Sequence, residues 1–75
     1  MNSSSHLRYC YELSEELYDS WVNGNLTYVV KQILLQDGVA NVAILTTLLF
    51  EKMSKTDRLL LFRMLDNLAT KNEGD

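Results

Sequence analysis

The stretch from Val39 to Phe50 reads V-A-N-V-A-I-L-T-T-L-L-F and contains no charged residue. Wound as an α-helix, it places apolar side chains on every side, because its polar members Asn41, Thr46 and Thr47 point in three different directions. A helix of this kind is a buried core helix, a membrane span or an oligomer contact. The stretch is well short of the roughly 20 residues that a bilayer span needs. We therefore predict that it forms the buried central helix of a small bundle.

An amphipathic helix is predicted before this stretch, ending at Asn23-Gly24, where glycine suits the left-handed position after a last turn. Its apolar stripe consists of Leu7, Cys10, Tyr11, Ser14, Leu17, Tyr18 and Trp21. Its opposite side carries four carboxylates, called here the acidic strip: Glu12, Glu15, Glu16 and Asp19. Because Arg8 is the only base among residues 1–24, the net charge of −3 of the whole chain is located on this helix.

A second helix is expected to begin after Asn25, as its N-cap, and to end near Gly38. Its core face comprises Leu26, Val29, Val30, Ile33 and Leu34. On the reverse side, Tyr28 and Leu35 lie seven residues apart and are candidates for a second contact surface. This pattern favours a helix over a strand, because the alternation that a strand requires fails at Val29-Val30.

The last helix is expected to start at Ser54, since Ser54 and Asp57 have the spacing of a capping box, with Thr56 as a rival cap. We expect this helix to bury Leu61, Phe62, Met64, Leu65, Leu68 and Ala69 and to expose Arg63, Asp66, Asn67 and Thr70. The fold class is therefore all-α: a compact bundle of four short helices, in one domain spanning residues 1–75. Residues 1–5 and 72–75 are expected to be frayed or disordered.

The apolar content exceeds what so small a bundle can hide. Three short helices must cover a fourth that is apolar on every side, and Tyr28, Leu35, Leu59 and Leu60 also need cover. A two-fold homodimer resolves this surplus most simply. With one cysteine and no signal peptide pattern at the start, we expect a cytoplasmic protein that does not enter a membrane.

Catalytic and metal chemistry find little support in the residues. The chain has one histidine, no glycine-rich phosphate loop and no nucleophile with a plausible base, so we predict no enzyme and no cofactor. His6 and Cys10 are one helical turn apart, but a structural zinc site needs four ligands, and a cysteine on an apolar stripe is usually a small buried hydrophobe. No metal site is predicted.

Direct nucleic-acid binding is also disfavoured. A helix-turn-helix over Val30 to Leu49 would leave its recognition helix without any Lys or Arg, although basic contacts to phosphate supply most of the affinity for DNA. The later bases Lys52, Lys55, Arg58 and Arg63 are diluted by Glu51, Asp57 and Asp66. A DNA-binding transcription regulator that uses Lys52 to Arg63 stays as an alternative, as does a structural subunit of a phage or mobile-element assembly.

The leading hypothesis is a non-enzymatic protein-interaction module, acting as a regulator, adaptor or inhibitor. Aromatic residues are over-represented in the anchors of interfaces, and carboxylates steer a basic partner. The predicted partner-binding residues are Glu12, Glu15, Glu16, Asp19, Tyr9, Tyr28 and Leu35. Tyr9 is included because it projects away from the apolar stripe of its helix.

Overall fold

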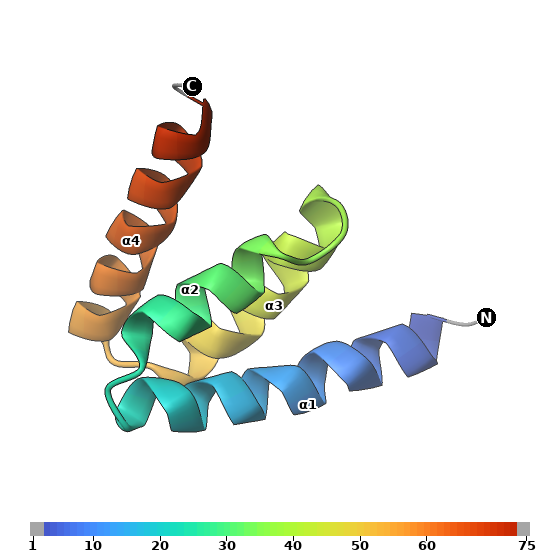
Figure 1. The fold of residues 1–75 in the computed structure, drawn as a ribbon. Coiled ribbons are helices and arrows are strands. Elements are labelled where there is room, and N and C mark those ends of the chain that lie inside the picture. The colour runs from blue at the N-terminus through green and yellow to red at the C-terminus, as the bar shows by residue number, and fades with distance from the viewer. Residues whose placement is uncertain (1–2, 74–75) are drawn as a thin grey trace.

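The computed structural model describes residues 3–73 and contains four helices in that range (Figure 1). They are α1 (Ser3–Val22), α2 (Leu26–Leu34), α3 (Val39–Lys52) and α4 (Lys55–Glu73). The all-α class and the four predicted helices are therefore confirmed. The helix α1 begins inside the serine leader rather than after it, so Ser3 to Ser5 are helical, while residues 1–2 and 74–75 of the expected frayed ends lie outside the described residues.

The break between α1 and α2 follows from Gly24, which has a φ of +92°. A Cβ placed there would meet no atom within 4 Å, so the backbone conformation rather than lack of space favours glycine. The amide of Gly24 donates to the carbonyl of Trp21, and the amide of Asn25 donates to that of Ser20. These bonds satisfy the last carbonyls of α1 and turn the chain sharply into α2.

The break before α3 differs from the prediction in one respect. Gly38 was expected to end the second helix, but α2 ends at Leu34 and Gly38 instead stands directly before α3, with a φ of +87°. Its carbonyl oxygen accepts the first hydrogen bond of α3, from the amide of Val42. Residues 35–38 form the loop between α2 and α3. Glycine adopts a positive φ without a steric penalty, so it can stand at either end of this loop.

The start of α4 is capped as predicted. The hydroxyl oxygen of Ser54 accepts a hydrogen bond of 3.2 Å from the amide of Asp57, whereas Thr56 lies inside the helix. Asn25, the other predicted cap, stands at the expected position before α2 but makes no side-chain capping bond. Ser54 therefore satisfies one of the free amides of α4, and the serine rather than the threonine fixes where that helix begins.

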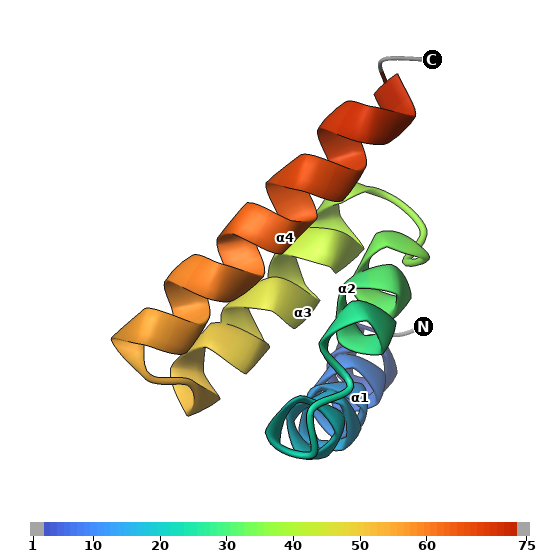
Figure 2. The same cartoon turned by 60° about the vertical axis from the view of Figure 1, so that its left-hand side comes forward.

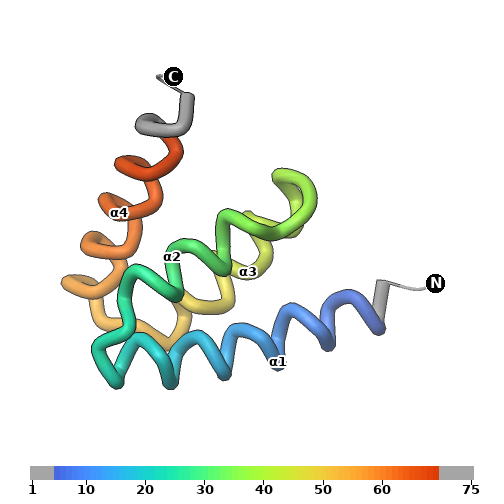
Figure 3. Tube along the Cα trace, viewed as in Figure 1, coloured from blue at the N-terminus to red at the C-terminus, as the bar shows by residue number. Residues whose placement is uncertain are grey.

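The core forms where α1 and α2 pack on α3 and where α4 packs on α2. Its fully or nearly buried apolar residues are Leu17, Trp21, Val29, Val30, Ile33, Leu45, Leu49, Met53 and Leu61. The helix α2 contacts each of the three others, and α1 crosses beneath α2 and α3 (Figures 1 and 2). In the trace of Figure 3, α1 and α4 are the long outer helices and both extend past α2 and α3.

The prediction that residues 39–50 are buried on every side is wrong. Only Leu45 and Leu49 of α3 are buried, while Val39 is 85% exposed and Ala43 and Thr47 also face solvent. The reason is the arrangement of the neighbours. The helices α1 and α2 pack on α3, whereas α4 packs mainly on α2, so the remaining side of α3 is left open by the helices of residues 3–73.

The predicted core face of α4 is likewise only partly buried. Leu61 is buried and Met64, Leu65 and Leu68 are partly buried, but Phe62 is 58% exposed and Ala69 is exposed. Thr70 lies outside the residues whose side chains are described, and Arg63, Asp66 and Asn67 are exposed as expected. The apolar residues of α4 therefore form two faces, one toward α2 and one that is exposed among the described residues.

Candidate protein-interaction surfaces

All seven predicted partner-binding residues are exposed. Tyr9, at 53% exposure, lies with Glu12, Glu16 and Asp19 on the side of α1 opposite its buried residues, so the structure brings these four together on one surface. The acidic strip and Tyr9 are thus adjacent, as the helical spacing indicates. Whether they contact a partner stays a prediction.

Glu15, the remaining member of the acidic strip, has a contact within the molecule. Its Oε2 lies 3.9 Å from Nζ of Lys52 at the end of α3, and that Nζ also lies 5.4 Å from the centre of the Tyr11 ring. Lys52 therefore connects α3 to α1 through a carboxylate and an aromatic face. Both groups of the ion pair are partly exposed, so its contribution to stability is no more than about 1 kcal/mol.

Tyr28 and Leu35 lie on α2 and just after it, apart from the acidic strip. Tyr28 lines a shallow depression with Leu26 and Thr27 of α2 and Met64 of α4. Leu35 is 72% exposed at the end of α2 and lines none of the depressions described here. The predicted second contact surface is therefore exposed, but Tyr28 and Leu35 do not form one site with α1.

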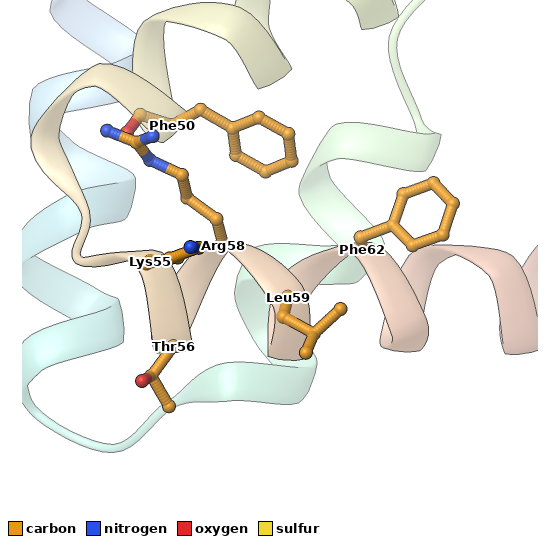
Figure 4. Close-up of a pocket in the computed structure, with 6 residues that line it drawn as sticks. All are labelled: Phe50, Lys55, Thr56, Arg58, Leu59 and Phe62. Carbon is orange, nitrogen blue, oxygen red and sulfur yellow. The ribbon is translucent and has the colours of Figure 1, made fainter.

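A third surface, which the sequence pattern did not reveal, lies along α3 and α4. At the turn between the two helices, an apolar depression is lined by Phe50, Lys55, Thr56, Arg58, Leu59 and Phe62. Figure 4 shows the Phe50 ring projecting from α3 on the same side of α4 as the Phe62 ring. The guanidinium group of Arg58 folds back toward Phe50, and its Nε donates a hydrogen bond to the Phe50 carbonyl.

This depression continues along α4. Phe62 also lines a second depression, together with Leu34, Val42, Ala43, Thr46, Leu65, Asp66 and Ala69. We call the two depressions together the α3–α4 groove. Ala43 in turn lines a further, smaller depression on α3 with Ile44, Thr47 and Leu48. The uncovered sides of α3 and α4 therefore form one largely apolar surface.

Charge is distributed unevenly along the α3–α4 groove. Lys55 and Arg58 lie at the end near the turn, and Asp66 lies farther along α4. The wall of the groove also contains the hydroxyl of Thr46, whose Oγ1 is buried and has no hydrogen-bond partner among the described residues. An occupant of the groove would thus meet apolar side chains in the middle and opposite charges toward the two ends.

His6 and Cys10, the residues considered as zinc ligands, lie in different surroundings. Cys10 is fully buried, and Nε2 of His6 is hydrogen-bonded to Oδ1 of Asn41 in α3. The amide of the Asn41 side chain donates to the carbonyl of Asp37, so His6 ties α1 to the start of α3. In the described part of the chain, no three His, Cys, Asp or Glu side chains gather in a way that would hold a metal ion.

None of the helices in residues 3–73 combines the length and the apolar composition that crossing a membrane requires. Comparison with models of protein families, with curated protein sequences and with solved structures finds no match to this chain.

Two features of the sequence bear on the groove. The predicted core had no place for Leu59 and Leu60, and both side chains are exposed. Phe50 and Phe62, in contrast, carried no signal that separates them from core residues, because an apolar residue at helical spacing looks the same on either side of a helix. The groove was therefore missed because its aromatic residues were assigned to the core.

Proposed function

We propose that this protein is a small non-enzymatic interaction module, a regulator or adaptor, which binds protein chains through the α3–α4 groove. The observation that supports the proposal is the exposure of Leu59 and Phe62 beside Phe50 in an apolar depression that runs along two helices. Small proteins that expose a continuous apolar surface of this kind commonly use it for binding. An aromatic anchor in such a depression is a frequent centre of binding energy.

The shape of the groove indicates the kind of ligand. It is bounded by two helices that diverge in Figure 1, and a groove between helices accepts an amphipathic helix whose apolar side chains recur at three and four residues. The acidic strip with Tyr9 lies on the outer side of α1, away from the core. In this proposal it is a second surface, which steers a basic partner by its charge.

A photo-crosslinking amino acid at position 62 tests the proposal. Position 62 is in the groove, and position 22 provides a matched control, because Val22 is also apolar and highly exposed but lines none of the depressions described above. We expect covalent adducts with a protein chain from position 62 in extracts of the source cells, and few or none from position 22. Leu59→Asp should remove the adducts while circular dichroism shows unchanged helicity.

The proposal is contradicted if position 62 gives no protein adduct, neither with a second copy of this chain nor with another protein. Equal labelling from positions 62 and 22 would contradict it as well, because it would show that exposure alone produces the adducts.

A further inference from the structure

The face of α4 that lines the α3–α4 groove is self-complementary about Phe62. Leu59 and Leu65 each stand three residues from Phe62, Arg58 and Asp66 each stand four residues from it, and all of these side chains line the α3–α4 groove. At 3.6 residues per turn, positions three and four residues away lie on the same side of a helix as the central residue. The face therefore reads base, leucine, phenylalanine, leucine, acid.

Such a pattern has a specific consequence under two-fold symmetry. When two identical helices pack antiparallel about an axis through the same residue, each residue before the axis meets the residue at the same distance after it. An axis at Phe62 places the two Phe62 rings against each other and Leu59 of one copy beside Leu65 of the other. It also places Arg58 beside Asp66, about 6 Å along the helix from the axis, once on each side.

The charged groups are available for this contact. Asp66 is exposed, and the structure records no ion pair for it within the described residues. Arg58 uses Nε to bind the carbonyl of Phe50, and its guanidinium group carries further N–H donors. A parallel arrangement of the same two helices would place Arg58 beside Arg58 and Asp66 beside Asp66, so the charges select the antiparallel one.

We infer that the occupant of the α3–α4 groove is a second copy of this chain, bound through an antiparallel α4 pair with its two-fold axis at Phe62. This inference rests on the proposed function, since it names the chain that the groove binds. Each α4 then lies against the groove of the other copy and covers Phe50, Leu59 and Phe62 of that copy. The dimer would therefore also cover the end of α3 where Phe50 lines the groove.

The experiment is a measurement of molar mass by light scattering and of the dimer dissociation constant by sedimentation, on the full chain and four variants. Phe62→Glu should be monomeric, because it places two carboxylates together on the axis. Asp66→Arg should raise the dissociation constant at least about tenfold, because Arg58 then meets an arginine twice. Combining Arg58→Asp with Asp66→Arg restores opposite charges and should recover most of the loss seen with Asp66→Arg alone.

Arg63→Asp is the matched control, because Arg63 is an exposed base of the same helix that lines neither depression of the groove. It should leave the dissociation constant unchanged, and circular dichroism should show equal helicity for all variants. A chain that is monomeric up to about millimolar concentration overturns the inference, while the proposed function survives if position 62 still crosslinks to a different protein. A dimer that persists in Phe62→Glu, or that the double charge exchange does not recover, overturns the inferred contact.

Discussion

Nε of Arg58 in α4 donates a hydrogen bond of 2.8 Å to the carbonyl oxygen of Phe50 in α3. The same carbonyl accepts the amide of Met53 at 3.1 Å, so one oxygen near the end of α3 holds both the turn and the first part of α4. This contact joins the end of α3 to the first turn of α4 at the base of the groove.

Replacing Arg58 by methionine keeps the apolar stem of the side chain and removes the donor. Because the bond is exposed to solvent, we expect a loss of no more than about 1 kcal/mol in the free energy of unfolding, measured with urea. Amide hydrogen exchange should increase in the last turn of α3 and the first turn of α4 and stay unchanged in α2. An increase spread evenly over all helices would show that Arg58 does not act locally.

Because α3 is buried unevenly, truncating different side chains of this helix to alanine should lower the free energy of unfolding by different amounts. Leu49→Ala removes a fully buried side chain and should lower the free energy of unfolding by about 2–5 kcal/mol. Val39→Ala is the control, because that side chain is 85% exposed, and it should change stability by less than about 0.5 kcal/mol. Comparable losses of unfolding free energy for Leu49→Ala and Val39→Ala would contradict the finding that one side of α3 is exposed.

The start of α4 predicts a difference between two neighbouring hydroxyl residues. Ser54→Ala removes the bond to the amide of Asp57 and should cost about 1 kcal/mol of stability. Thr56→Ala should cost close to nothing, since that hydroxyl caps no helix. Thermal unfolding followed by circular dichroism compares the two variants. A larger loss of stability for Thr56→Ala would show that Thr56, and not Ser54, is the N-cap.

The acidic strip predicts a kinetic effect on partner binding. Changing Glu12, Glu16 and Asp19 together to lysine reverses the charge of the outer side of α1 and leaves the contact between Glu15 and Lys52 in place. For a basic partner recovered by crosslinking, we expect association to slow at least about tenfold at low salt, with dissociation changed much less. Stopped-flow mixing measures both rates, and an unchanged association rate removes the strip from the mechanism.

The bases of α3 and α4 predict weak affinity for DNA. Lys52 already interacts with Glu15 and Tyr11, and Glu51, Asp57 and Asp66 lie among the remaining bases, so little net positive charge is left to attract phosphates. Micromolar protein should therefore not retard duplex DNA at low salt in a gel. Retardation that weakens steeply as salt is added would instead favour the DNA-binding alternative.

The all-α class and the helix breaks at Gly24 and Ser54 were predictable from local sequence signals. Gly24 and Ser54 act on the backbone within a few residues of themselves, through a positive φ and through a capping bond. Such local signals do not depend on what the rest of the chain does. The exposure of the acidic strip and of Tyr9, Tyr28 and Leu35 followed in the same way, because residues opposite an apolar stripe face away from the core.

The packing of the helices, and not the local pattern, sets which apolar residues are buried. Periodicity shows that α3 is apolar on every side and that α4 has many leucines, but it does not show how many helices surround each one. The neighbours of α3 are α1 and α2, while α4 packs mainly on α2, and this arrangement exposes Val39 and Phe62 and forms the α3–α4 groove. Burial depends on contacts between distant parts of the chain, and for that reason the local pattern indicated an excess apolar residue such as Leu59 but not the groove that it lines.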